Sequence, residues 1–130
     1  MRDYVTDTHA LYWYLTASSK LGVNAQAAFL AGEQGLTRIY IPSIVLAELY
    51  YLNAKYNRPL EFTQEYERLA GAGQFHFVDF RAADVLRFDI LATIPEMHDR
   101  IIAGVAYAMG LPLLTRDTEI VESRVVQTVW

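Results

Sequence analysis

The sequence contains no cysteine, and this absence excludes two classes of site. A disulfide framework cannot form, and no metal ion can be held by thiolates. The absence also fits a protein of the reducing cytoplasm. Long apolar runs are missing too, since no stretch approaches the roughly 20 residues that a helix needs to cross a bilayer. The stretch from Met1 to Asp7 is too short and too acidic for a signal peptide, so we expect a cytoplasmic protein with no membrane partner.

Positive charge is also scarce, because 11 lysines and arginines face 15 aspartates and glutamates, for a net charge of −4. Proteins that hold nucleic acid through their overall field are usually basic. The chain is therefore either an ordinary acidic protein, or one in which local arginines and a bound metal reverse the sign of the charge in one cleft. The length of 130 residues predicts one domain, residues 1–130, and a hydrophobic content of 53% suffices for a substantial core.

Short apolar segments alternate with helical patterns along the chain. The expected strands are residues 4–6, 38–41, 75–78, 111–115 and 125–129. The expected helices are residues 10–15, 24–31, 43–56, 61–69, 82–91, 98–109 and 119–123. This alternation predicts a three-layer α/β/α fold, with a mostly parallel sheet between two layers of helices. Ligands of such folds bind outside the carboxyl ends of the strands, where the strand order reverses.

Three aspartates lie at the ends of expected elements. Asp7 and Asp117 each follow a strand, and Asp99 lies in the first turn of a helix. Each position has a local explanation, because an aspartate there can accept a hydrogen bond from a free backbone N–H or interact favourably with the helix dipole. Taken singly, the three acids are explained by capping.

Glu48 has no such local explanation. It lies inside an expected helix, with Ile44 four residues before it and Leu52 four after it, so the three share one face. Val45 and Leu49 flank this line, and we expect the face to pack on the sheet. A carboxylate in that place is costly unless it is paired, hydrogen-bonded or metal-bound. The alternative is that Glu48 lies at the edge of the apolar stripe with its carboxylate in water.

Together, the four acids are expected to converge. Asp7 and Asp117 end two strands, Asp99 begins the helix that leads back into one of them, and Glu48 lies just over one turn into the helix after a third strand. A carboxylate cluster without a cationic partner repels itself, and a divalent metal ion is the simplest counter-charge. Ligation by oxygen alone favours Mg²⁺ or Mn²⁺.

The polar residues near the four acids in the sequence say less about the site. Zinc would require histidine or cysteine ligands, and the three histidines (His9, His76 and His98) show no ligand spacing. We expect His98 to face solvent. Threonines 6, 8 and 115 either hydrogen-bond the carboxylates or a bound water, or are ordinary threonines at strand ends.

These motifs resemble those of a known family. Asp7-Thr8-His9 after a strand resembles the opening of PIN-domain nucleases, particularly the VapC-type toxins of bacterial and archaeal toxin–antitoxin pairs. Residues 42–49, with Glu48, resemble their second acidic motif, and residues 99–103 followed by 113–117 resemble the third and fourth. Residues 126–130 resemble their last strand. The resemblance covers essentially the whole chain in the expected order.

The resemblance implies a five-stranded parallel sheet between helices. It also implies RNA cleavage that depends on Mg²⁺ or Mn²⁺, and a cognate antitoxin that occupies the site. Transferred by position, the acidic quartet would be Asp7, Glu48, Asp99 and Asp117, with Thr115 as a supporting hydroxyl.

Phosphodiester hydrolysis needs an activated water and stabilisation of developing negative charge, and a metal held by carboxylates supplies both. We predict that Asp7 and Asp99 hold the first ion and that Asp117 assists, directly or through water. Glu48 would orient water or complete a second site.

Two arginines adjoin the predicted ligands in the sequence, Arg100 after Asp99 and Arg116 before Asp117. They either contact substrate phosphates or are ordinary solvated arginines.

Aromatic residues are dense in the helical pair 43–69 and in the first helix. They are Tyr50, Tyr51, Tyr56, Phe62 and Tyr66 in the pair, with Trp13 and Tyr14 in the first helix. Such residues either form core or mark an interface, for a homodimer or for an antitoxin helix. We expect a homodimer.

Other functions fit less well. Phosphoryl transfer through an aspartyl phosphate needs a second acid soon after the nucleophile and a lysine near the last strands. Position 9 is histidine, and the only lysines, Lys20 and Lys55, are far from those strands in the sequence. A non-catalytic PIN-like scaffold would be expected to lose acids, and all four are present. Such a scaffold and a housekeeping RNA-processing nuclease of the same family are the alternatives to a toxin.

Overall fold

The computed structural model describes residues 2–130, which contain a five-stranded sheet of order β3-β2-β1-β4-β5. Every neighbouring pair of strands is parallel. The strands are β1 (Tyr4–Thr6), β2 (Ile39–Pro42), β3 (Phe75–Val78), β4 (Leu113–Leu114) and β5 (Thr128–Val129). The helices are α1 (Thr8–Leu15), α2 (Val23–Glu33), α3 (Ser43–Lys55), α4 (Phe62–Gly71), the 3₁₀ helix η1 (Ala82–Arg87), α5 (Met97–Met109) and α6 (Thr118–Ser123).

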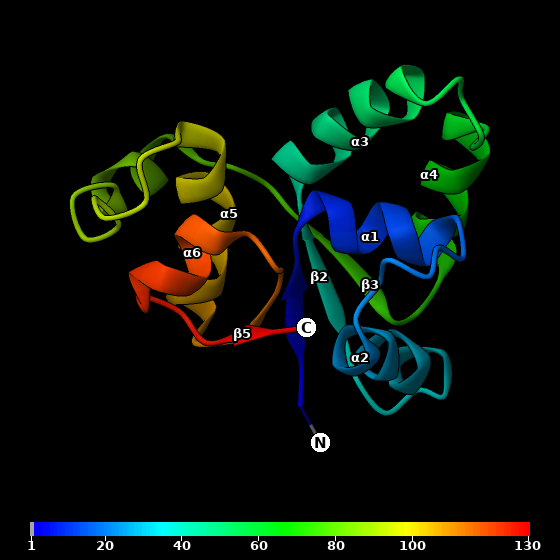
Figure 1. The fold of residues 1–130 in the computed structure, drawn as a ribbon, viewed down its shortest axis with the longest axis horizontal. Helices are drawn as coiled ribbons and strands as arrows, with labels where there is room; N and C mark the ends of the chain where they lie inside the picture. Colours follow the sequence, from blue (N-terminus) through cyan, green and yellow to red (C-terminus); the bar gives the residue numbers. More distant parts are fainter. Residues whose placement is uncertain (1) are drawn as a thin grey trace.

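The helices lie in two layers on either side of the sheet. Helices α1, α2 and α4 lie on one side, and α5 and α6 lie on the other (Figure 1). The three-layer α/β/α prediction with five strands is therefore confirmed, and the sheet is wholly parallel. None of the helices in residues 2–130 is both long and apolar enough to span a bilayer.

The strands are apolar because helices cover both faces of the sheet. Val5 in β1, Ile39 and Ile41 in β2, and Leu113 and Leu114 in β4 are all fully buried. They belong to one hydrophobic cluster that also contains buried residues of the covering helices. The two-layer cover explains why these strands show continuous apolar runs rather than alternation.

Some boundaries differ from those expected. Residues 82–91, expected as a helix, form only the short η1, in which no residue is buried, so packing does not extend it. The strand expected at residues 111–115 shortens to two residues. Pro112 has no N–H to donate to the ladder at the start of this segment. At its end, Thr115 N still donates to Val129 O (3.2 Å) before the chain turns towards Asp117. The last strand likewise begins at Thr128 rather than at residue 125.

The buried face of α3 is not the one expected. Val45, Leu49 and Asn53 are its buried residues, whereas Glu48 lies to one side with its side chain 31% exposed. The expectation that Glu48 shares the face packed on the sheet was wrong, and the edge position is the correct one. The reason is that Val45 and Leu49 define a stripe centred about one residue away, which turns Glu48 towards the end of the sheet.

The chain reverses between α5 and β4. Gly110 ends α5 in the left-handed region at φ 66°, which glycine adopts without the steric cost of a Cβ. Leu111 N then donates to Ala106 O (3.1 Å), which closes the last turn. Because α5 returns into β4, the first turn of α5, at its opposite end, lies towards the edge where β4 ends.

Candidate active site

Two of the aspartates follow neighbouring strands at the centre of the sheet. Strands β1 and β4 pair directly, with Thr6 opposite Leu114, and Asp7 N donates to Leu114 O (3.1 Å). On one side of β1 lie β2 and β3, and on the other lie β4 and β5, so the strand order reverses here. Asp7 and Asp117 thus stand at the carboxyl ends of the strands that flank the switch point, where α/β folds bind ligands.

A cavity of about 770 Å³ opens at this edge, and all four predicted acids line it. Asp7 comes from the end of β1, Glu48 from α3, Asp99 from the first turn of α5, and Asp117 from the turn before α6. The fold therefore brings together carboxylates that are up to 110 positions apart in the chain.

Helix capping explains two of the acids in part. Asp7 Oδ1 accepts from Ala10 N (2.8 Å), and Asp117 Oδ1 accepts from Glu119 N (3.0 Å) and Ile120 N (3.1 Å). These bonds use one oxygen of each carboxylate and leave Oδ2 for other partners. Asp99 is not a cap, because Glu96 caps α5 through Asp99 N (2.9 Å). Capping therefore fixes Asp7 and Asp117 without accounting for the cluster.

Glu48 is held by polar neighbours from two other elements. Thr8 Oγ1 donates to Glu48 Oε1 (2.7 Å), and His98 Nδ1 lies 3.3 Å from Glu48 Oε2. Thr8 is buried at the start of α1, so its hydroxyl sets the direction of the Glu48 carboxylate. The two contacts join α3 to α1 and to α5.

Burial and mutual repulsion make two of the carboxyls weak acids. Burial raises the pKa of Asp7 to about 6; hydrogen bonds from the Thr115 hydroxyl and from Ala10 N oppose the rise. Burial likewise raises the pKa of Asp99 to about 7, and the neighbouring carboxylates add to it, Asp117 most of all. Within residues 2–130, no lysine, arginine or histidine forms an ion pair with Asp7, Asp99 or Asp117. The aspartates thus lack a compensating positive charge.

Cationic and aromatic side chains form the outer part of the same cavity. Lys20, Lys55, Arg116 and His9 line it and are exposed, together with several aromatic rings, whereas Asp7 is buried. Burial lowers the pKa of His9, the Glu48 carboxylate opposes this change, and Arg116 adds to it. The cavity thus has an acidic floor and a positively charged rim.

Sequence reasoning missed several of these rim residues. His98 was expected to face solvent, yet it contacts Glu48 and lines the cavity. Lys20 and Lys55 were set aside as distant in sequence from the last strands, yet both line the same cavity as Asp117. The spacing of Glu48 and Lys55, seven residues apart on one helix, was the available signal for Lys55. Nothing local in the sequence indicated Lys20.

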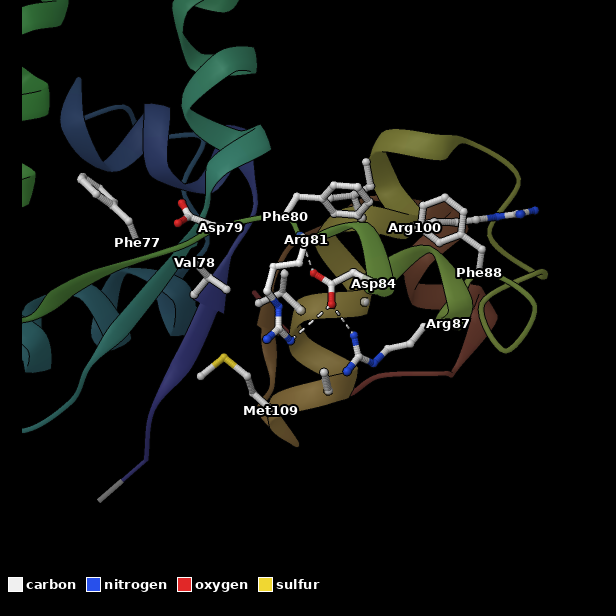
Figure 2. A pocket seen from close by; sticks show the side chains of 14 residues that line it. Phe77, Val78, Asp79, Phe80, Arg81, Asp84, Arg87, Phe88, Arg100 and Met109 are labelled. Atoms are coloured by element: carbon white, nitrogen blue, oxygen red, sulfur yellow. Dashed lines mark hydrogen bonds and ion pairs between the residues drawn. The ribbon is translucent and has the colours of Figure 1, made fainter.

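Thr115 and Arg100 take different positions relative to the acids. Thr115 is buried at the end of β4, and its hydroxyl accepts from Asp117 N, so it supports the acidic turn. Arg100 is not brought to the carboxylates. It lines a second cavity of about 350 Å³ between β3, η1 and α5 (Figure 2), and it donates to the carbonyls of Ile94 and Ala92. Of the two predicted phosphate-binding arginines, only Arg116 faces the acids.

The aromatic residues divide between core and surface. Trp13 is buried, and Tyr14 stacks on Phe29 with ring centroids 4.3 Å apart. The core interpretation therefore holds for the first helix. On the α3–α4 pair, Tyr51 is 74% exposed, and the other exposed tyrosines there are Tyr50, Tyr56 and Tyr66. Tyr51 and Tyr56 line the outer part of the acidic cavity.

The residues fit a hard divalent cation by their chemistry. All four acids offer oxygen, and within residues 2–130 no lysine, arginine or histidine forms an ion pair with the three aspartates. Across residues 2–130, no three histidine, aspartate or glutamate side chains form a ready-made metal cage. Binding an ion would require the carboxylates that share the cavity to draw closer together.

The class of protein is defined by its wholly parallel five-stranded α/β/α fold and by the acids that lie together at the switch point of the sheet. Residues 4–124 match the profile of the PIN domain, and the chain belongs to the PIN domain family. A search of curated proteins found no matching sequence.

Solved structures with the same fold include toxin–antitoxin complexes. VapBC2 from Rickettsia felis bound to a promoter DNA fragment is 20% identical, with 98% of this chain and 97% of that chain covered at a TM-score of 0.64. A toxin–antitoxin complex from Klebsiella pneumoniae is 20% identical, with coverage of 98% and 96% and a TM-score of 0.65. DNA-bound VapBC from Salmonella typhimurium is 19% identical, with coverage of 99% and 98% and a TM-score of 0.66. At these identities the likeness establishes the fold.

Proposed function

We propose that this protein is a metal-dependent endoribonuclease, the toxin of a toxin–antitoxin pair. The observation that carries the proposal is the convergence of Asp7, Glu48, Asp99 and Asp117 on one cavity, with no cation paired to the aspartates in the described residues. A PIN domain supports a nuclease, and the architecture is shared with proteins described as toxin–antitoxin complexes.

The acids have different proposed roles. Asp7 and Asp99 would hold the first Mg²⁺ or Mn²⁺, because they carry the raised pKa values and so gain most from a bound cation. Asp117 would assist directly or through water. Glu48, fixed by Thr8 and facing His98, would orient water or complete a second site. When bound, the ion supplies positive charge that activates a water nucleophile and offsets the charge of the phosphate in the transition state.

The rim would deliver the substrate to these acids. RNA phosphates are repelled by an acidic floor, so binding requires local positive charge, which Lys20, Lys55 and Arg116 provide despite a net charge of −4. This arrangement fits the second explanation of the net charge, in which local cationic side chains and a bound metal ion reverse the sign of the charge in one cleft.

The antitoxin partner is proposed from the similarity to toxin–antitoxin complexes, and the homodimer from the exposed tyrosines of the α3–α4 pair. A cognate antitoxin would cover the cavity and keep the nuclease inactive, and the protein would form a homodimer in the cytoplasm. Light scattering on the purified chain, alone and with the product of a short neighbouring reading frame, tests both assemblies.

RNA cleavage by purified protein tests the activity. Wild type is expected to cleave RNA with Mg²⁺ or Mn²⁺ and to stop when EDTA is added. Asp7→Asn and Asp99→Asn are expected to lose at least about 10²-fold in rate, as groups that place catalytic charge commonly do. Asp89→Asn is the matched control, because Asp89 is exposed and lies outside the cavity.

Two results would refute the proposal. One is cleavage that survives EDTA, and the other is equal cleavage by wild type and both cavity variants. Absence of cleavage by wild type with either metal ion is one case of the second result and refutes the nuclease assignment.

A further inference from the structure

Both tryptophans of the chain lie beside one arginine at the rim of the acidic cavity. Arg116 Cζ is 4.5 Å from the ring centroid of Trp13 and 5.7 Å from that of Trp130. The two indoles are themselves in edge contact, with centroids 5.7 Å apart and planes at 70°. The guanidinium therefore faces two aromatic surfaces, each of which attracts a cation.

Trp130 packs closely against its neighbours. A Cβ on Gly22 would lie 2.4 Å from Trp130 Cδ1, so only glycine leaves room for this indole. Asn24 Nδ2 donates to Trp130 O (2.9 Å), which fixes the backbone at the same point. On the other side, Trp13 is only 9% exposed within α1. Two buried or anchored rings thus determine where Arg116 lies.

Arg116 is placed among acids without being neutralised by them. It directly precedes Asp117 and lines the cavity that all four acids share. Within residues 2–130 it nevertheless forms no ion pair with a carboxylate within 4.0 Å. Aromatic contact leaves the in-plane N–H donors of a guanidinium available, and these donors match a phosphate group.

We propose that Trp13 and Trp130 are positioning residues that hold Arg116 as the binding site for an RNA backbone phosphate next to the scissile one. This inference rests on the proposed nuclease function and adds to it the group that anchors the substrate strand. Without the two rings, a flexible arginine would turn towards the adjacent carboxylates and would be lost to the substrate. The two rings therefore keep the guanidinium of Arg116 away from the carboxylates and leave its N–H donors free for a phosphate.

RNA binding measured without turnover tests the inference. Each protein carries Asp99→Asn and is kept in EDTA, and a single-stranded RNA oligonucleotide is the probe. Arg116→Gln is expected to bind about tenfold more weakly, the usual scale for a lost charge-assisted hydrogen bond. It should also lower the slope of log K against log salt by about 1, because one phosphate contact is lost. Arg38→Gln is the matched control, because Arg38 is exposed, precedes β2 at the amino ends of the strands, and lies outside the cavity.

Trp130 is tested by the same measurements. Trp130→Leu is expected to weaken RNA binding in the same direction as Arg116→Gln, and Trp130→Phe is expected to restore most of it, because a ring is again present. Circular dichroism confirms that each variant is folded. In the cleaving protein, Arg116→Gln should raise KM about tenfold with a smaller change in kcat, since a binding contact is removed.

Intrinsic fluorescence gives an independent readout. The chain has only two tryptophans, and both contact Arg116, so a change in emission reports on this place alone. We expect added RNA to change the emission of wild type, and to change it less in Arg116→Gln at equal saturation.

The inference is overturned if Arg116→Gln binds RNA with the affinity and salt slope of wild type. It is also overturned if the variant weakens binding to an antitoxin but not to RNA, because the arginine would then serve a protein partner. These results leave the nuclease proposal intact when wild type still cleaves RNA. Weaker RNA binding by Arg116→Gln, together with no cleavage by wild type, would instead support the phosphate site and refute the nuclease.

Discussion

Replacing Asp7 by asparagine should stabilise the metal-free protein at neutral and alkaline pH. Asp7 is 8% exposed at the floor of the cavity and lacks a cationic partner among the described residues. Asparagine is close to aspartate in size and also caps helices well, so the hydrogen bond from Ala10 N to position 7 is kept. The substitution therefore removes mainly the buried negative charge.

The size of the effect follows from linkage between protonation and folding. The pKa of Asp7 rises from 3.8 in the unfolded reference to about 6 in the folded protein. A folded pKa above the unfolded one means that the folded state binds the proton more tightly, so wild type loses stability as pH rises from about 4 to 7. At about 1.4 kcal/mol per pKa unit, this loss is about 3 kcal/mol for Asp7. Asp7→Asn has no carboxylate at this position and therefore keeps this part of its free energy of unfolding as pH rises.

Urea unfolding at a series of pH values, with EDTA present, measures the difference. The free energy of unfolding of Asp7→Asn minus that of wild type should be larger at pH 8 than near pH 4 by about 3 kcal/mol. Asp99 also titrates in this range, but it is present in both proteins and largely cancels. A difference that does not change with pH would refute the reasoning, because it would mean that the Asp7 carboxylate is not penalised by its surroundings. Saturating Mg²⁺ should stabilise wild type and narrow the gap.

Two further variants examine how the site and its supporting helices are held. Thr8→Val removes the hydroxyl that donates to Glu48 Oε1 (2.7 Å), and we expect RNA cleavage to fall about tenfold with little change in fold, measured as kcat with circular dichroism as control. Asn53→Ala removes two buried hydrogen bonds, to Leu60 O (2.9 Å) and from Leu60 N (3.0 Å), that join α3 to the start of α4. It should lower the free energy of unfolding by about 2–3 kcal/mol in urea, whereas a loss below about 0.5 kcal/mol would show that the pair does not lock the two helices.

The fold was predictable because its signals are local. Apolar segments such as β2 and β4, with turn residues between helical patterns, indicate strands covered on both faces. Where packing rather than pattern decides, prediction failed. Residues 82–91 have helix-forming composition, yet η1 buries no side chain and stays one short 3₁₀ helix. Local propensity does not reveal how much of a segment finds a surface to pack on.

The acids of the site were predictable from topology alone. Asp7 and Asp117 follow strands, and the ends of neighbouring parallel strands meet at one edge, so their convergence needs no side-chain detail. The rim was not predictable in this way. Lys20 reaches the cavity from the loop after α1, and Arg100 turns to the carbonyls of Ile94 and Ala92 although it adjoins Asp99. Adjacency in sequence therefore misplaced one arginine and missed one lysine.

Glu48 shows where the hydrophobic pattern reaches its limit. Its neighbours at four-residue spacing are apolar, and this suggested a buried face. The structure shifts that face by one position, to Val45 and Leu49, and leaves Glu48 at the edge of the cavity. A helical face read from sequence is uncertain by about one residue, or about 100° of rotation, and that is enough to exchange a buried carboxylate for one that borders the cavity.

Binding of Mn²⁺, followed by the electron paramagnetic resonance signal of the free ion, asks whether carboxylates from four separate segments form one cation site. Wild type is expected to remove Mn²⁺ from solution at pH 8. Asp99→Asn and Asp7→Asn should each lose most of that binding, and Asp89→Asn should retain it. Equal Mn²⁺ binding by all four proteins, or none by wild type, would show that the acidic cavity does not hold a hard cation.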